Sequence, residues 1–177
     1  PVRDLFRVSE RGLHVGLRKG NETAVAFGAP GGRRVTVRYN PRFAGDAVLV
    51  PQRPDVVLTI EGPGWPALHL LVDAKYRVDA SAEYTARYGS PGPPEDAVNV
   101  LHRYRDAILD AAPGRRPARA VVEAAAAFPL HAPPGYRDGA LWRALERLGV
   151  GAVPLLPGDE AWLGEWLRRA LSRGGWA

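Results

Sequence analysis

Two aspartates and a lysine are the residues of this sequence best suited to do chemistry together. Asp55 follows Arg53-Pro54, and Asp73 comes eighteen residues later, two positions before Lys75. Of the 24 lysines and arginines in the chain, only Lys19 and Lys75 are lysines. An ammonium group can sit beside a metal-bound water and adjust its own pKa, whereas a guanidinium stays charged and planar. A lysine at this position therefore indicates chemistry that an arginine could not supply.

The two aspartates are expected to meet on neighbouring strands. Asp55–Ile60 and Leu68–Val72 are dense apolar runs, as is typical of central strands that are covered on both faces. The intervening residues 62–66 read Gly-Pro-Gly-Trp-Pro, which is a turn sequence. The two runs therefore predict an antiparallel hairpin. Because side chains alternate along a strand, Asp73 and Lys75 should project from the same face.

Converging carboxylates at the end of such a hairpin predict a site for a hard cation. Two nearby carboxylates repel each other unless one is protonated or a cation lies between them. Mg²⁺ usually takes one or two carboxylates together with water and phosphate oxygens, and the backbone carbonyl of Ala74 could add a ligand. The metal would acidify a bound water, while Lys75 would orient that water or stabilise the transition state. The alternative is that Asp55 merely begins a strand and that Asp73 and Lys75 form a surface ion pair.

The remaining elements predict a mixed α/β sheet. Arg34–Tyr39 alternates charged and apolar residues, which favours a half-exposed strand. Residues 79–94 are rich in Pro, Gly and Ser, and we expect a mobile loop there. The clearest helix is 96–112, where apolar residues recur at helical spacing. Other strands are expected at 13–17, 23–27, 118–128 and 150–156, and other helices at 141–148 and 159–171.

Length, composition and charge limit the classes of protein to consider. A chain of 177 residues fits one domain. It contains no apolar run long enough to cross a membrane, and no signal peptide is visible. The absence of cysteine excludes disulfide frameworks and thiolate zinc sites, and fits a cytoplasmic protein. The net charge of +5 permits an anionic partner such as nucleic acid, although base composition or heat adaptation would also explain it. Because the chain starts at Pro1, we expect that it was processed or cut from something longer.

Three segments carry a resemblance to a known family. They are residues 53–58 (Arg-Pro-Asp-Val-Val-Leu), 71–77 (Leu-Val-Asp-Ala-Lys-Tyr-Arg) and 102–108 (His-Arg-Tyr-Arg-Asp-Ala-Ile). Together they resemble the PD-(D/E)xK nuclease superfamily, and within it the McrC-type nuclease subunits of modified-DNA restriction systems and their relatives of unknown function. Residues 39–43 and 151–158 are similar to the same group, so the resemblance runs from about residue 34 to the C-terminus.

This resemblance implies a fold, an activity and partners. The fold would be restriction-endonuclease-like, a mixed sheet flanked by helices over residues 46–177, with a β-rich extension over residues 1–45 in a single compact unit. The activity would be Mg²⁺-dependent hydrolysis of DNA phosphodiester bonds, with Mn²⁺ as a substitute metal. Asp55 and Asp73 would be metal ligands and Lys75 the catalytic lysine. Expected partners are DNA, a separate NTPase motor or recognition subunit, and a second copy of the chain; RNA as the substrate stays open, as does a non-cleaving module that binds DNA or protein.

Six further residues are candidates for an auxiliary or DNA-binding role. Arg105 and Arg103 could contact phosphate, and a plain exposed helix face is the alternative for Arg103. Glu61 shares the strand parity of the first aspartate, with a turn residue as the alternative. His102 and Asp106 are four residues apart on a helix, which suits either a metal or a solvated pair. Arg115 and Arg116 lie in a loop and could contact DNA, with a plain solvated loop as the alternative. The full set of candidates is Glu61, His102, Tyr104, Arg105, Arg115 and Arg116.

Overall fold

A six-stranded mixed β-sheet is the centre of the protein. The computed structural model describes residues 6–9, 14–17, 24–45, 48–111 and 116–173. The strand order is β12-β11-β8-β7-β4-β3, with β8, β11 and β12 parallel and the other neighbours antiparallel. These strands are β3 (Ala24–Ala29), β4 (Arg33–Tyr39), β7 (Val56–Glu61), β8 (Leu68–Ala74), β11 (Val121–Phe128) and β12 (Val150–Pro154). Mixed α/β architecture and the antiparallel β7–β8 hairpin are both confirmed.

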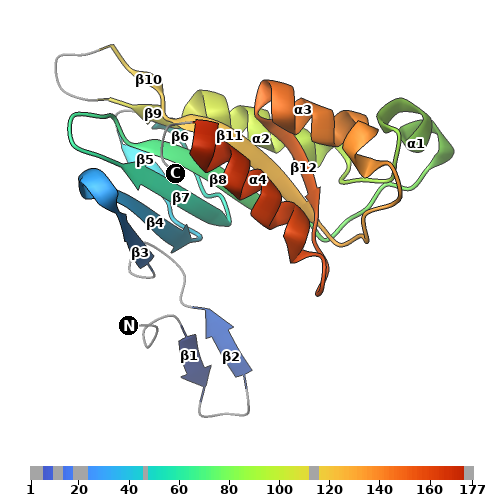
Figure 1. Cartoon of the computed structure of the whole chain (residues 1–177), viewed down its shortest axis with the longest axis horizontal. Helices are drawn as coiled ribbons and strands as arrows, with labels where there is room; N and C mark the ends of the chain where they lie inside the picture. Colours follow the sequence, from blue (N-terminus) through green and yellow to red (C-terminus); the bar gives the residue numbers. More distant parts are fainter. Residues whose placement is uncertain (1–5, 10–13, 18–23, 46–47, 112–115, 174–177) are drawn as a thin grey trace.

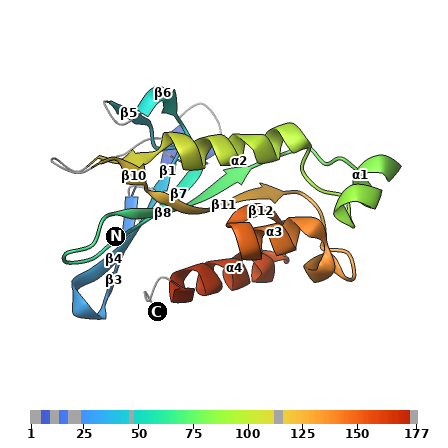
Figure 2. The same cartoon turned by 90° about the horizontal axis from the view of Figure 1, so that it is seen from above.

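Helices cover both faces of this sheet. The α-helices of the described residues are α1 (Ala82–Tyr88), α2 (Glu95–Ala107), α3 (Ala140–Leu148) and α4 (Glu160–Arg173), and short 3₁₀ turns occupy Pro30–Gly32 and Tyr136–Asp138. Figure 1 shows α3 and α4 in front of the sheet. Seen from above, α2 and the strands β5 (Phe43–Gly45) and β6 (Val48–Gln52) lie on one face, and α3 and α4 lie on the other (Figure 2). This arrangement is consistent with a restriction-endonuclease-like fold.

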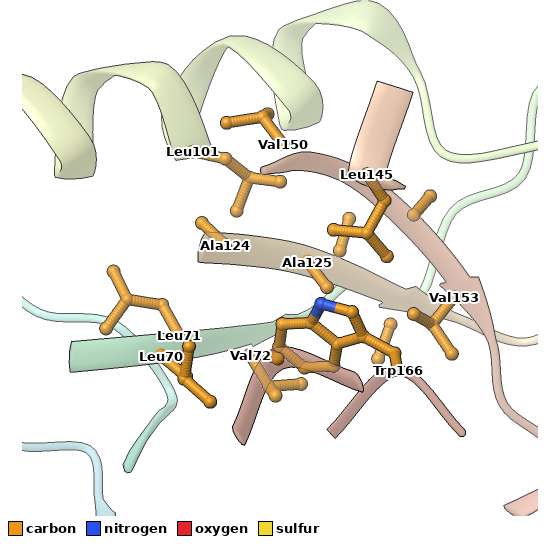
Figure 3. Packing of buried hydrophobic residues seen from close by; sticks show 14 of the residues in the cluster. Leu70, Leu71, Val72, Leu101, Ala124, Ala125, Leu145, Val150, Val153 and Trp166 are labelled. Carbon is orange, nitrogen blue, oxygen red and sulfur yellow. The ribbon is translucent and has the colours of Figure 1, made fainter. Parts of the chain in front are cut away.

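The core forms where small residues of β11 let the two helical layers approach the sheet. Ala124, Ala125 and Ala126 have no exposed surface. Figure 3 shows Leu101 of α2 on one side of these strands and the Trp166 indole of α4 on the other. The Trp166 Nε1–H donates to the carboxylate of Glu123 at 2.7 Å, so the only polar atom of this large ring is satisfied. An alanine-rich strand is therefore explained by packing and not by strand propensity.

Three pairs of short strands lie outside the central sheet. β1 (Phe6–Ser9) pairs with β2 (His14–Leu17), and β5 pairs with β6, each antiparallel. β9 (Leu109–Asp110) pairs with β10 (Ala118–Arg119) just after α2. The β5–β6 hairpin matters most for function, because it leads directly into Asp55.

The long helix ends earlier than its sequence predicts. We expected a helix over residues 96–112, but α2 ends at Ala107 and Ile108 is already extended, with φ −96° and ψ 106°. Leu109 and Asp110 instead pair with β10, and Arg119 of β10 forms an ion pair of 2.6 Å with Asp106. The strand ladder therefore replaces the last helical turn.

Residues 79–94 also differ from expectation, since they contain a helix where the sequence predicted only a mobile loop. The hydroxyl of Ser81 accepts a hydrogen bond from the Tyr84 N–H at 3.3 Å and caps α1. Gly89 ends α1 with φ 83°, a conformation that favours glycine. The Tyr84 ring is buried, and its hydroxyl donates to the Pro93 carbonyl at 2.5 Å. Seven residues are too few for a helical repeat to stand out, but the caps and one buried tyrosine hold the segment.

Strands β3 and β4 extend the same sheet that carries β7 and β8. β4 pairs with β7 over six residue pairs, and β3 pairs with β4 over six more. The hydrogen-bonded ladder thus runs across the expected boundary between residues 45 and 46.

Among the described residues, no helix has the length and apolar character needed to cross a membrane.

Candidate active site

Asp55 and Asp73 face each other across the β7–β8 hairpin. Val56 pairs with Val72 at the end of the ladder, so the next residues, Asp55 and Asp73, stand opposite one another. The Ala74 N–H donates to Asp55 Oδ2 at 2.8 Å. On the other side, the Asn40 N–H donates to the main-chain carbonyl of Asp55 at 2.5 Å. Two neighbouring strands therefore fix the position of Asp55.

Burial and a neighbouring carboxylate perturb Asp73. The residue is 3% exposed. Burial raises the pKa of its carboxyl group, the Lys75 ammonium opposes this by lowering the pKa, and Asp55 raises it further. The net effect is a raised pKa, because desolvation and a like charge both disfavour the ionised form.

Lys75 is the cation that balances this pair. Its Nζ forms an ion pair with Asp73 Oδ2, a buried oxygen that has no hydrogen bond among the described residues. The Lys75 N–H donates to the Ala127 carbonyl at 2.7 Å, so the main chain stays strand-like beyond the end of β8. That extension keeps Asp73 and Lys75 on one face of the sheet.

Tyr104 of α2 packs near the aspartate pair and bonds to the segment that precedes Asp55. Its ring is buried, and its hydroxyl donates to the Arg53 carbonyl at 3.4 Å. The pKa of this hydroxyl is raised to about 12, first by burial and then by the negative charge of Asp73, with Asp55 adding to the effect. The hydrogen bond to Arg53, two residues before Asp55, places the phenol near the aspartate pair.

Two of the other candidates lie elsewhere in the fold. Glu61 is exposed at the opposite end of β7, in register with Arg34. Six residues of strand separate it from Asp55, which is a distance of about 20 Å. Arg105 donates from Nη1 to the Leu148 carbonyl at 2.6 Å, so its guanidinium binds the C-terminal end of α3, where a cation is favourable.

The structure does not join the remaining candidates to the carboxylates. His102 is exposed on α2, and Asp106, with which it was expected to pair, forms its ion pair with Arg119 instead. Arg116 is exposed in the segment before β10. Arg115 lies outside the described residues.

The donor set of the site fits a hard divalent cation. Asp55 and Asp73 supply two carboxylates at one point, one of which is already ion-paired with Lys75, and their mutual repulsion would be relieved further by the charge of a cation. Mg²⁺ is commonly held by one or two carboxylates, with water and substrate filling the rest of its octahedron. Within the described residues no cluster of three or more Asp, Glu, His or Cys occurs, so the protein would supply few of the ligands. The carbonyl of Ala74 stays a prediction as a ligand.

Sequence reasoning missed one buried residue beside the site. Gln52, 3% exposed, lies three positions before Asp55 and accepts a hydrogen bond from Arg103 Nε at 3.2 Å. A glutamine at the end of a strand of exposed residues carries no sequence signal for burial. Its position immediately before Arg53-Pro54-Asp55 was the only available hint.

Comparison with known proteins supports the reading of these motifs. A family model described as the PD-(D/E)XK nuclease superfamily matches residues 1–132, which include the β7–β8 hairpin and α2. No curated protein matches this chain, and no solved structure matches it. Since the family model covers well over half of the sequence, this chain belongs to the PD-(D/E)XK nuclease superfamily.

Proposed function

We propose that this protein is a Mg²⁺-dependent DNA endonuclease and the nuclease part of a restriction or defence system, similar to McrC-type subunits. The observation that carries the proposal is the buried Asp73 carboxylate held between Asp55 and the ammonium of Lys75. Members of the superfamily are typically metal-dependent, and Mn²⁺ should substitute for Mg²⁺. The protein would work in the cytoplasm with a separate NTPase motor or recognition subunit, and as one or two copies.

Each residue of the site would have a separate role in phosphodiester hydrolysis. Asp55 and Asp73 would hold the cation, which would supply Lewis-acid stabilisation of negative charge on the phosphate. Lys75 would place its ammonium against the scissile phosphate and stabilise charge that develops there, since Nζ already lies at the carboxylate pair. Tyr104 would keep α2 at a fixed distance through its hydrogen bond to the Arg53 carbonyl.

The first test replaces Lys75. We expect Lys75→Ala to lower the rate of Mg²⁺-dependent cleavage of plasmid and linear DNA by about a thousandfold, because the charge that stabilises the transition state is lost. Lys75→Arg keeps a positive charge beside buried Asp73, and so protects the fold, but should not restore cleavage. Lys19→Ala, the only other lysine of the sequence, is the matched control. Unchanged cleavage by both Lys75 variants would refute the proposed role.

A second candidate function is a non-cleaving module that binds DNA or a protein partner. It is favoured by the small number of protein ligands, two carboxylates without a third acidic or histidine side chain in the described residues. Calorimetric titration with Mg²⁺ and Mn²⁺ separates the two functions. Metal binding that Asp73→Asn abolishes supports the nuclease, whereas DNA binding with no metal binding supports the inactive module.

A further inference from the structure

A second cation lies beside Tyr104, the residue whose hydroxyl donates to the carbonyl of Arg53, two positions before Asp55. Arg103 of α2 donates from Nε to the Gln52 side-chain carbonyl at 3.2 Å. The Gln52 amide nitrogen donates to the Val50 carbonyl at 2.6 Å. Both ends of this buried amide are thus engaged, the nitrogen with β6 and the carbonyl with α2. A hydrogen-bonded link therefore runs from the β5–β6 hairpin to Arg103.

The Arg103 guanidinium lies beside Tyr104, between that tyrosine and solvent. Its Cζ is 5.7 Å from the centre of the Tyr104 ring. The guanidinium hydrogen-bonds and attracts the phenolate form, which lowers the pKa of Tyr104, while Asp73 and Asp55 raise it. Arg103 is also exposed, so its guanidinium is accessible to a ligand that approaches Tyr104 from solvent.

The hydrogen bonds of Arg103 leave much of its guanidinium available. An arginine has five N–H donors in a planar fork that matches the oxygens of a phosphate. Gln52 takes the Nε–H. The remaining N–H groups belong to the terminal nitrogens, which form the outer edge of the fork. Arg105, its neighbour on the helix, is by contrast already bound to the Leu148 carbonyl.

We infer that Arg103 binds a phosphate of the substrate backbone and that Gln52 is its positioning residue. A phosphate that reaches Asp55 and Asp73 would meet Lys75 from β8 and Arg103 from α2. The two cations would offset the repulsion between the phosphate and the carboxylates. This inference rests on the proposed nuclease function and adds to it a residue that contacts substrate outside the motif.

The test measures DNA binding at constant Mg²⁺ in the Lys75→Ala background, where cleavage is not expected. Arg103→Ala should weaken binding about tenfold, because a charge-assisted hydrogen bond is lost. It should also reduce the slope of log K against log salt by about 0.9 between about 50 and 200 mM KCl, which is the contribution of one phosphate contact. Arg143→Ala, an exposed arginine on α3 at the other face of the sheet, should leave the affinity and the slope unchanged.

Gln52→Leu removes the amide but keeps the approximate shape of the side chain. We expect it to weaken binding less than Arg103→Ala, and the double variant to bind no more weakly than Arg103→Ala alone. That non-additivity identifies positioning, because an independent structural effect would add to the loss. Thermal melting of each variant checks the fold, and Arg103→Lys should recover only part of the affinity.

Each result separates the inference from the function on which it rests. If Arg103→Ala leaves both the affinity and the salt slope unchanged while cleavage still requires Lys75, the inference is wrong and the nuclease assignment stands. If the double variant shows additive losses, Gln52 does not position Arg103. If the unsubstituted protein neither binds nor cleaves DNA, the proposed function fails, and the inference fails with it.

Discussion

Burial is the property that makes Asp73 chemically unusual. The carboxylate is nearly removed from water and lies beside a second one, so its pKa is raised. An ion taken out of water loses several kcal/mol of solvation unless a partner compensates, and here the partner is the side chain only two residues along the chain. Groups perturbed in this way are concentrated at functional sites, which is why the aspartate pair is a better candidate than any exposed acidic residue.

His69 gives the protein a pH dependence that is separate from the active site. Its Nδ1 is 3.1 Å from the Thr59 hydroxyl, and that hydroxyl accepts a hydrogen bond from Arg38 at 3.2 Å. The Thr59 hydroxyl has one proton and two lone pairs, so it can either donate to an unprotonated Nδ1 of His69 or accept from a protonated one. Burial, with the charge of Arg38 as a second cause, lowers the pKa of His69 from 6.5 to about 4, although Asp110 acts in the opposite direction.

We expect His69 to make the protein less stable in acid. Because the folded-state pKa of His69 is depressed, the unfolded chain takes up a proton between pH 6.5 and 4 and the folded protein does not. The contribution of His69 is thus complete above pH 6.5 and is lost as the pH falls, by about 2 kcal/mol between pH 7.5 and 5. Urea denaturation should show a smaller loss for His69→Gln, which does not titrate. Parallel pH profiles for the two proteins would contradict this.

At the scale of residues, the sequence could predict contacts along one hairpin but not contacts between distant segments. Asp55 and Asp73 were placed opposite each other because a short turn and two apolar runs fix which residues pair. The contact between Gln52 and Arg103 joins residues 51 apart in sequence. It depends on how the β5–β6 hairpin packs beneath α2, and no local pattern encodes that packing. For the same reason, the sequence could not show that Arg105 bonds to Leu148 of α3 while Arg103 bonds to Gln52.

At the scale of elements, α3 and β12 are in direct backbone contact. A Cβ added to Gly151 of β12 would lie 2.2 Å from the Leu141 carbonyl oxygen and 2.8 Å from the Leu145 nitrogen. Real side chains do not approach backbone atoms so closely, so only a glycine permits α3 to lie at this distance. The short link Leu148–Gly149–Val150 and the close packing together hold β12 at the sheet edge.

We therefore expect Gly151→Ala to destabilise the protein by about 2 kcal/mol or more, because α3 must move away from the sheet to make room for the methyl group. The matched control is Gly164→Ala in α4, where the nearest atom to an added Cβ is the flexible end of Arg168 at 3.5 Å. Alanine in a helix interior should stabilise by about 0.5–1 kcal/mol. Urea denaturation measures both effects. A Gly151→Ala variant as stable as the unsubstituted protein would show that this contact is not tight.

Element types were more predictable than element ends. The apolar stripe of α2 identified the helix, yet its last predicted turn was wrong because β9 pairs with β10 and draws Leu109 and Asp110 into a ladder. Helix α1 was missed because its stability comes from Ser81, Gly89 and the burial of Tyr84, and not from a repeated stripe. In both places tertiary contacts override the local pattern.

At the scale of the whole molecule, the β-rich first part and the motif-bearing strands share one sheet. β4 covers the free edge of β7, whose Val57 and Ile60 are each 1% exposed. Asp55 lies immediately before β7, and its main-chain carbonyl accepts a hydrogen bond from the N–H of Asn40, which follows the last residue of β4. The division between residues 1–45 and 46–177 that the sequence suggested stays a prediction about domains, and the shared ladder makes it testable.

A shortened chain that begins at residue 46 should not fold cooperatively. It would lose β3, β4 and β5, leave β7 and β6 without these strand partners and expose apolar side chains that β4 now covers, all of which favour aggregation. A chain that begins at Thr23 keeps both strands and removes β1 and β2, which pair with each other, so it should keep a sharp urea transition. Size-exclusion chromatography and urea denaturation compare the two. If the chain that begins at residue 46 stays monomeric and unfolds at the same urea concentration, β3, β4 and β5 form a dispensable extension, and the active-site hairpin needs no support from β4.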